Sequence, residues 1–132
     1  MKTFNGFLHP KRKENLKFVL SDAFVDEDGT PLEWEMRQLS AKEGMELTKN
    51  LTSTETSEIW AHYVANALVV PNLRDAEFLE DLSKREGRKI LDPLDALYCL
   101  VTDGELAKLM ELYNKHNSVY SGFQKSVQEA KN

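Results

Sequence analysis

The fold class is decided by a turn that leads into an alternating strand: Asp26-Glu27-Asp28-Gly29-Thr30-Pro31-Leu32-Glu33-Trp34-Glu35-Met36. The alternation places Leu32, Trp34 and Met36 on one face of the strand and the glutamates on the other. Gly29 can adopt the positive φ that closes a turn back onto the preceding apolar run, which ends at Val25. The sequence therefore predicts a β-hairpin over residues 16–39.

The next part of the chain, residues 40–117, favours about five short helices. Their boundaries carry residues that satisfy the free backbone groups at helix ends. Capping boxes at Ser40 to Glu43 and at Thr102 to Glu105 begin two of the helices, and Asp75 and Asp92-Pro93 begin two others. The helix that starts at Asp75 ends at Gly87, and the helix with the apolar residues Ile59 to Leu68 ends before Pro71. Because an isolated hairpin is marginal in water, its apolar face must pack on this helical part. The predicted fold is α+β, mostly α.

The length of 132 residues suits one domain with shorter flanking segments. Residues 1–15 carry four basic side chains against one acidic one, and Gly6 and Pro10 interrupt their periodicity, so they are expected to form a flexible basic arm. Residues 16–117 are the expected globular domain, with the hairpin at 16–39 and the helices at 40–117. Residues 118–132 are expected to form a polar C-terminal tail.

Composition excludes several classes of protein. With 17 Lys and Arg against 22 Asp and Glu, the formal net charge is −5, which argues against nucleic-acid binding. No apolar run approaches the roughly 20 residues of a membrane span, and the N-terminus does not resemble a signal peptide. The single cysteine, Cys99, lies in an apolar run and is expected to be buried and inert. A cytoplasmic protein is predicted.

No pattern of residues points to catalysis, a cofactor or a metal. The motifs of serine hydrolases, phosphate-binding loops, zinc proteases and dithiol enzymes are missing. The acidic turn resembles a calcium loop only in part, because Phe24 would be the first ligand and Pro31 would lie inside the loop. An aspartate-rich turn that hydrogen-bonds its own backbone is the preferred interpretation. We expect no enzyme and no cofactor.

Three segments, in this order, resemble a known family. They are Phe24 to Arg37 around the hairpin turn, Ala65-Asn66-Ala67-Leu68-Val69-Val70-Pro71-Asn72-Leu73-Arg74-Asp75-Ala76-Glu77, and Asp103-Gly104-Glu105-Leu106 to Leu112. Together they resemble the small tail assembly chaperones of long-tailed phages and Gram-positive prophages, over about residues 16–117. The motifs are short and carry no catalytic chemistry, but their order and spacing are unusual.

The resemblance implies a non-enzymatic chaperone in the host cytoplasm. It would bind and solubilise the helical tape measure protein, promote assembly of the major tail tube protein around it, and stay out of the mature virion. Amphipathic side chains on the helical part are the expected partner-binding residues, namely Tyr63, Tyr98, Met110 and Tyr113. Helical spacing alone does not distinguish such residues from core. Self-association is also expected, because many weak sites along one partner give avidity.

An alternative function is a phage or bacterial regulatory adaptor that binds a nucleic-acid-binding protein. A basic patch formed by Lys11, Arg12, Lys13 and Arg37 would favour this adaptor. A continuous apolar groove would favour the chaperone.

Overall fold

The computed structural model describes residues 2–51 and 55–118. Its sheet contains the predicted hairpin: β1 (Leu16–Val19) pairs with β2 (Glu33–Met36) in antiparallel register, with Phe18 opposite Trp34. The hairpin turn is built as expected, because Gly29 has a φ of 81° and the side chain of Asp26 accepts hydrogen bonds from the backbone N–H of Asp28 and Thr30, both at 2.9 Å. The prediction of a turn that hydrogen-bonds its own backbone is confirmed.

A third strand, β3 (Leu68–Val70), pairs antiparallel with β2 and gives the sheet order β1-β2-β3. The sequence predicts that the preceding helix includes Leu68, and this is wrong, because α3 (Thr56–Ala67) ends one residue earlier. The helix ends early because the unpaired edge of β2 offers backbone hydrogen bonds to the residues that follow it. Leu68 lies opposite Met36, and the N–H of Arg37 donates to the carbonyl of Ala67 at 2.9 Å.

Within residues 40–51 and 55–118, which the structure describes, five helices follow the hairpin in the predicted order. Besides α3 they are α2 (Ala41–Lys49), α4 (Ala76–Glu86), α5 (Pro93–Leu100) and α6 (Asp103–Asn117). Both capping boxes form, and Gly87 ends α4 in the left-handed conformation, with a φ of 72°. Local capping chemistry thus determines most helix boundaries. The α+β, mostly α, fold class is confirmed.

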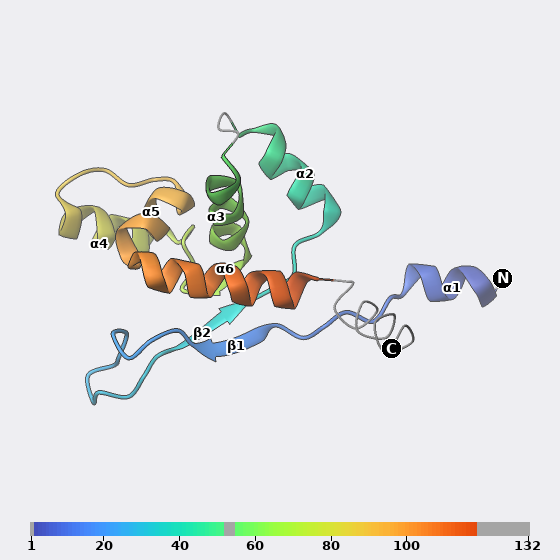
Figure 1. Ribbon diagram of the computed structural model, residues 1–132, viewed down its shortest axis with the longest axis horizontal. Coiled ribbons are helices and arrows are strands. Elements are labelled where there is room, and N and C mark those ends of the chain that lie inside the picture. The colour runs from blue at the N-terminus through green and yellow to red at the C-terminus, as the bar shows by residue number, and fades with distance from the viewer. Residues whose placement is uncertain (1, 52–54, 119–132) are drawn as a thin grey trace, which may run out of the picture.

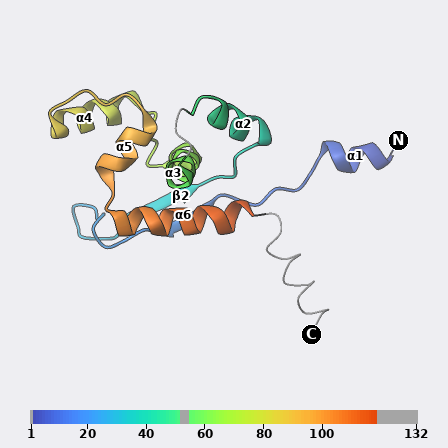
Figure 2. The same cartoon turned by 45° about the horizontal axis from the view of Figure 1, so that its top comes forward.

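One further helix, α1 (Lys2–Leu8), lies in residues 1–15, the segment expected to be a flexible basic arm. Gly6 falls inside it and costs about 1 kcal/mol relative to Ala, but Pro10 lies beyond its end, so the two residues do not prevent a short helix. Figures 1 and 2 show α1 projecting away from the sheet and the other helices. The predicted tail after Ser118 lies outside the described residues.

The core forms where the hairpin meets the helices. Trp34 and Met36 of β2 are buried with Leu97 of α5 and Leu109 of α6 in one cluster. Figure 1 shows α2 to α6 on the same side of the sheet, with α6 running along the hairpin. The ammonium of Lys108 links α6 to the end of β1 by donating to the backbone carbonyls of Val19 at 3.3 Å and of Leu20, the next residue, at 2.7 Å. One face of α6 is therefore committed to the interior.

Candidate partner-binding surface

Two of the four predicted partner-binding residues lie together at one hollow. Tyr98 of α5 and Met110 of α6 line an open hollow of about 270 Å³. Its other lining residues are Ser57, Asp103, Leu106 and Ala107. We call it the α5–α6 hollow. Leu106 and Met110 are four residues apart and so share a helix face, a signal that the sequence already contained.

Tyr98 is the aromatic side chain that lines this hollow, and 47% of its surface is accessible. Partial burial, together with the negative charge of Glu58, raises the pKa of its phenol. The hydroxyl therefore stays protonated at neutral pH and can donate a hydrogen bond. Asp103 adds a second carboxylate beside the apolar lining. The hollow offers an apolar floor, one hydroxyl donor and negative charge.

The other two predicted residues, Tyr63 and Tyr113, belong to an aromatic cluster between α3 and α6. Trp60 completes this cluster, with ring centroids 6.1 Å from Tyr63 and 5.8 Å from Tyr113. The rings of Tyr63 and Tyr113 stack at 6.0 Å. Tyr113 is 7% exposed, and its burial raises the pKa of its phenol to about 12. Tyr113 is therefore a core residue, and the ring of Tyr63 lies parallel to its ring.

The basic residues that would favour an adaptor meet only in part. Arg12, Lys13 and Arg37 line a hollow of about 680 Å³, whereas Lys11 lies outside it. The guanidinium of Arg37 forms a bidentate ion pair with the carboxylate of Glu43, with N–O distances of 3.0 and 2.6 Å. This ion pair lowers the pKa of Glu43 to about 2. Lys13 donates to the carbonyl of His116 at 3.1 Å. Because Glu43 compensates the charge of Arg37, the patch is weaker than four free cations would be.

Cys99 is partly buried rather than fully enclosed. Burial raises the pKa of its thiol, although Arg88, whose guanidinium donates to Sγ at 3.2 Å, acts in the opposite direction. A raised pKa leaves the thiol protonated at neutral pH, which is unfavourable for a nucleophile. Within the described residues, no group of three or more His, Cys, Asp or Glu is placed to hold a metal ion. In the same part of the chain, no helix has the length and apolar character needed to cross a membrane.

Comparison with known proteins identifies the family. The family model described as phage XkdN-like tail assembly chaperone protein matches residues 4–131. The chain belongs to this family. The resemblance in the three sequence segments is thereby confirmed.

One solved structure, described as the crystal structure of the protein YqbN, is similar to this tail assembly chaperone. It superposes with a TM-score of 0.67 at 21% identity, covering 84% of this chain and 92% of that one. At that identity the similarity shows a shared fold. A search of curated proteins gave no match.

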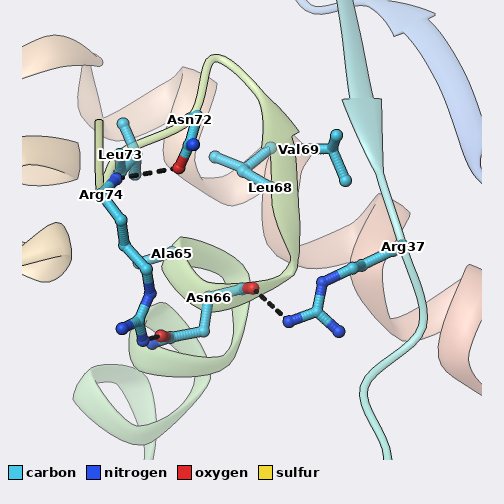
Figure 3. Close-up of a pocket in the computed structure, with 8 residues that line it drawn as sticks. All are labelled: Arg37, Ala65, Asn66, Leu68, Val69, Asn72, Leu73 and Arg74. Atoms are coloured by element: carbon cyan, nitrogen blue, oxygen red, sulfur yellow. Dashed lines mark hydrogen bonds between the residues drawn. The ribbon is translucent and has the colours of Figure 1, made fainter. Parts of the chain in front are cut away.

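Ala65 to Glu77, one of the three segments that resemble the family, connects α3 through β3 to α4 in this chaperone. Its residues between Ala65 and Arg74, together with Arg37, line a pocket of about 300 Å³. Figure 3 shows these residues around the pocket. The guanidinium of Arg37 donates to the carbonyl of Asn66 at 3.3 Å, and that of Arg74 donates to the side-chain oxygen of Asn66. Asn72 accepts from the N–H of Arg74 at 3.0 Å. These contacts hold the crossing from α3 through β3 to α4.

Proposed function

We propose that this tail assembly chaperone binds an amphipathic helical segment of the tape measure protein in the α5–α6 hollow. The match to the family model over residues 4–131 carries the proposal. The hollow is the surface where we propose that the partner helix binds, since Tyr98, Leu106 and Met110 present apolar surface beside the carboxylate of Asp103. Helix-in-groove recognition requires apolar side chains at spacings of three and four on the partner, and a basic residue at the edge of that stripe would complement Asp103.

The physical need for such a partner comes from the tape measure chain itself. A long helical chain made in the cytoplasm exposes apolar stripes until the tail tube covers them, and exposed apolar patches promote aggregation. Weak contacts repeated along the chain keep it soluble and still allow major tail tube subunits to displace the chaperone. We propose a role without catalysis, in the host cytoplasm and outside the mature virion.

Co-expression tests this proposal. The tape measure protein is produced with and without this chain, and the soluble fraction and the recovered complex are measured. We expect greater solubility of the tape measure protein and a complex with several copies of the chaperone. Equal solubility with no recovered complex would contradict the proposed function.

A pair of variants then tests the surface. Tyr98→Asp places a charge on the hollow and should reduce recovery of the complex roughly tenfold, because truncating or charging a central contact removes much of the binding energy. Met45→Asp is the matched control, since Met45 is 71% exposed on α2, away from the hollow. Equal recovery with both variants would place the contact elsewhere. Tyr113→Asp is unsuitable because it would bury a charge in the core.

A further inference from the structure

The pocket beside Arg37 and Arg74 has the opposite charge to the α5–α6 hollow. Its volume is about 300 Å³, and two guanidinium groups stand in its lining. All of the lining residues belong to the described part of the chain, and none of them carries a carboxylate. The rest of the lining consists of two amide side chains and four apolar ones, namely Asn66, Asn72, Ala65, Leu68, Val69 and Leu73. This combination suits a negatively charged group that stands beside an apolar one.

The two guanidinium groups differ in how far their charge is compensated. Arg37 forms the bidentate ion pair with Glu43. Arg74 forms no ion pair within residues 2–51 and 55–118, and its guanidinium donates to the side-chain oxygen of Asn66. Figure 3 shows both guanidinium groups reaching Asn66. Because a guanidinium has several N–H donors in one plane, Arg74 keeps donors for a ligand. Arg74 therefore supplies the uncompensated positive charge of this pocket.

The hollow on the α2 side of the same arginines is less suited to an anion. This hollow of about 440 Å³ shares Arg37, Asn66 and Arg74 with the pocket. It also contains the carboxylates of Glu43 and Glu46. Like charges at short range repel one another, so these carboxylates oppose a second negative group there. A negatively charged ligand of Arg74 is therefore directed to the pocket that Figure 3 shows.

The charge of the pocket favours a single carboxylate over a polyanion. One uncompensated guanidinium balances one negative charge, and its planar donors match the two oxygens of a carboxylate. A nucleic acid, by contrast, would be repelled by the formal net charge of −5 of the whole chain. Leu68 and Val69 add apolar surface that a free anion would leave unused. A side-chain carboxylate next to an aliphatic residue in a protein uses both parts of the lining.

We propose that this pocket binds an aspartate or glutamate side chain of a protein partner, at a position where an aliphatic residue stands beside it. Arg74 donates to the carboxylate oxygens, Arg37 adds positive charge at the wall, and Val69 contacts the aliphatic neighbour. The proposal does not rest on tape measure binding in the α5–α6 hollow, because the two surfaces share no lining residue. The partner of this pocket is acidic, whereas the hollow favours a basic residue beside its apolar stripe.

A peptide titration of the full chain, labelled with ¹⁵N and followed by NMR, tests this proposal. The probe is the blocked tripeptide N-acetyl-leucyl-glutamyl-leucinamide, and the matched control is N-acetyl-leucyl-glutaminyl-leucinamide, which differs only in charge. The acidic peptide should shift the side-chain amide signals of Asn66 and Asn72 until they saturate. It should bind about tenfold more tightly than the neutral peptide, because a hydrogen bond to a charged group is the stronger one.

Three arginine variants locate the contact. Arg74→Gln should weaken binding of the acidic peptide about tenfold and leave the neutral peptide unaffected. Arg74→Lys keeps the charge but loses the planar donors, so it should have a smaller effect. Arg12→Gln removes the same charge outside the pocket and should bind like wild type. Arg74 and Arg12 are exposed, so the backbone amide signals of all three variants should show a folded chain.

Several outcomes would overturn the proposal. They are equal binding of the two peptides, the absence of saturable shifts with the acidic peptide, and binding that Arg74→Gln leaves unchanged. Inorganic phosphate is the second probe. If phosphate shifts the same signals at a lower concentration than the acidic peptide, the pocket is a phosphate site and the proposed protein contact is wrong.

Discussion

Tyr113 and Met110 lie on the same helix, α6, and each has neighbours of a different kind. Tyr113 stacks on Tyr63 and is closed off by Trp60, whereas Met110, three residues earlier, shares the open α5–α6 hollow with Tyr98. The residue types and the helical spacing are alike. What differs is the side chain that faces each residue, because α3 places Trp60 and Tyr63 against Tyr113, whereas it contributes Ser57 to the lining of the open hollow. Whether an aromatic side chain is buried or is free to bind a partner therefore depends on which helix packs against it.

The largest expected difference between the aromatic cluster and the hollow is in stability. Tyr113→Ala should lower the free energy of unfolding by about 3–5 kcal/mol, because it removes a buried ring and leaves a cavity between α3 and α6. Urea unfolding followed by tryptophan fluorescence measures this loss. Tyr113→Phe is the control and should cost much less, since the ring remains. A small loss for Tyr113→Ala would mean that the cluster is not part of the core.

The second, smaller difference is in how the free energy of unfolding changes at alkaline pH. The pKa of Tyr113 in the folded protein is about 12, above the ordinary value near 10 of the unfolded chain. Stability from this group is complete below pH 10 and is lost as the pH rises toward 12, by about 2–3 kcal/mol. Unfolding measured between pH 9 and pH 12 should show a shallower loss in Tyr113→Phe than in wild type. Identical pH profiles would contradict the burial of this phenol.

The smallest expected effect on stability belongs to the open hollow. Tyr98→Ala should change the free energy of unfolding by less than about 1 kcal/mol, because nearly half of the side chain already contacts solvent. The same urea experiment measures it, and pull-down of the tape measure protein measures the loss of binding. A Tyr98 variant as unstable as Tyr113→Ala would remove the distinction between the aromatic cluster and the hollow.

Local chemistry explains why the helix boundaries could be predicted. Ser40 with Glu43 and Thr102 with Glu105 satisfy backbone N–H groups three residues away, so their partners are visible in the sequence. Gly87 and Gly29 need only their own backbone freedom to end a helix and to close a turn. The strand Leu68–Val70 was missed because its hydrogen-bonding partner, β2, lies about 30 residues earlier in the chain.

The candidate surface also combines features set by neighbouring residues with features set by distant parts of the chain. The sequence by itself determined the hairpin, the order of the helices, the helix caps and, through the order of three short segments, the tail assembly chaperone family. Only the tertiary structure decided which aromatic side chains are interior, where the third strand pairs and which apolar residues share a hollow. Caps and turns act over three or four residues, whereas burial depends on which distant element lies opposite each side chain.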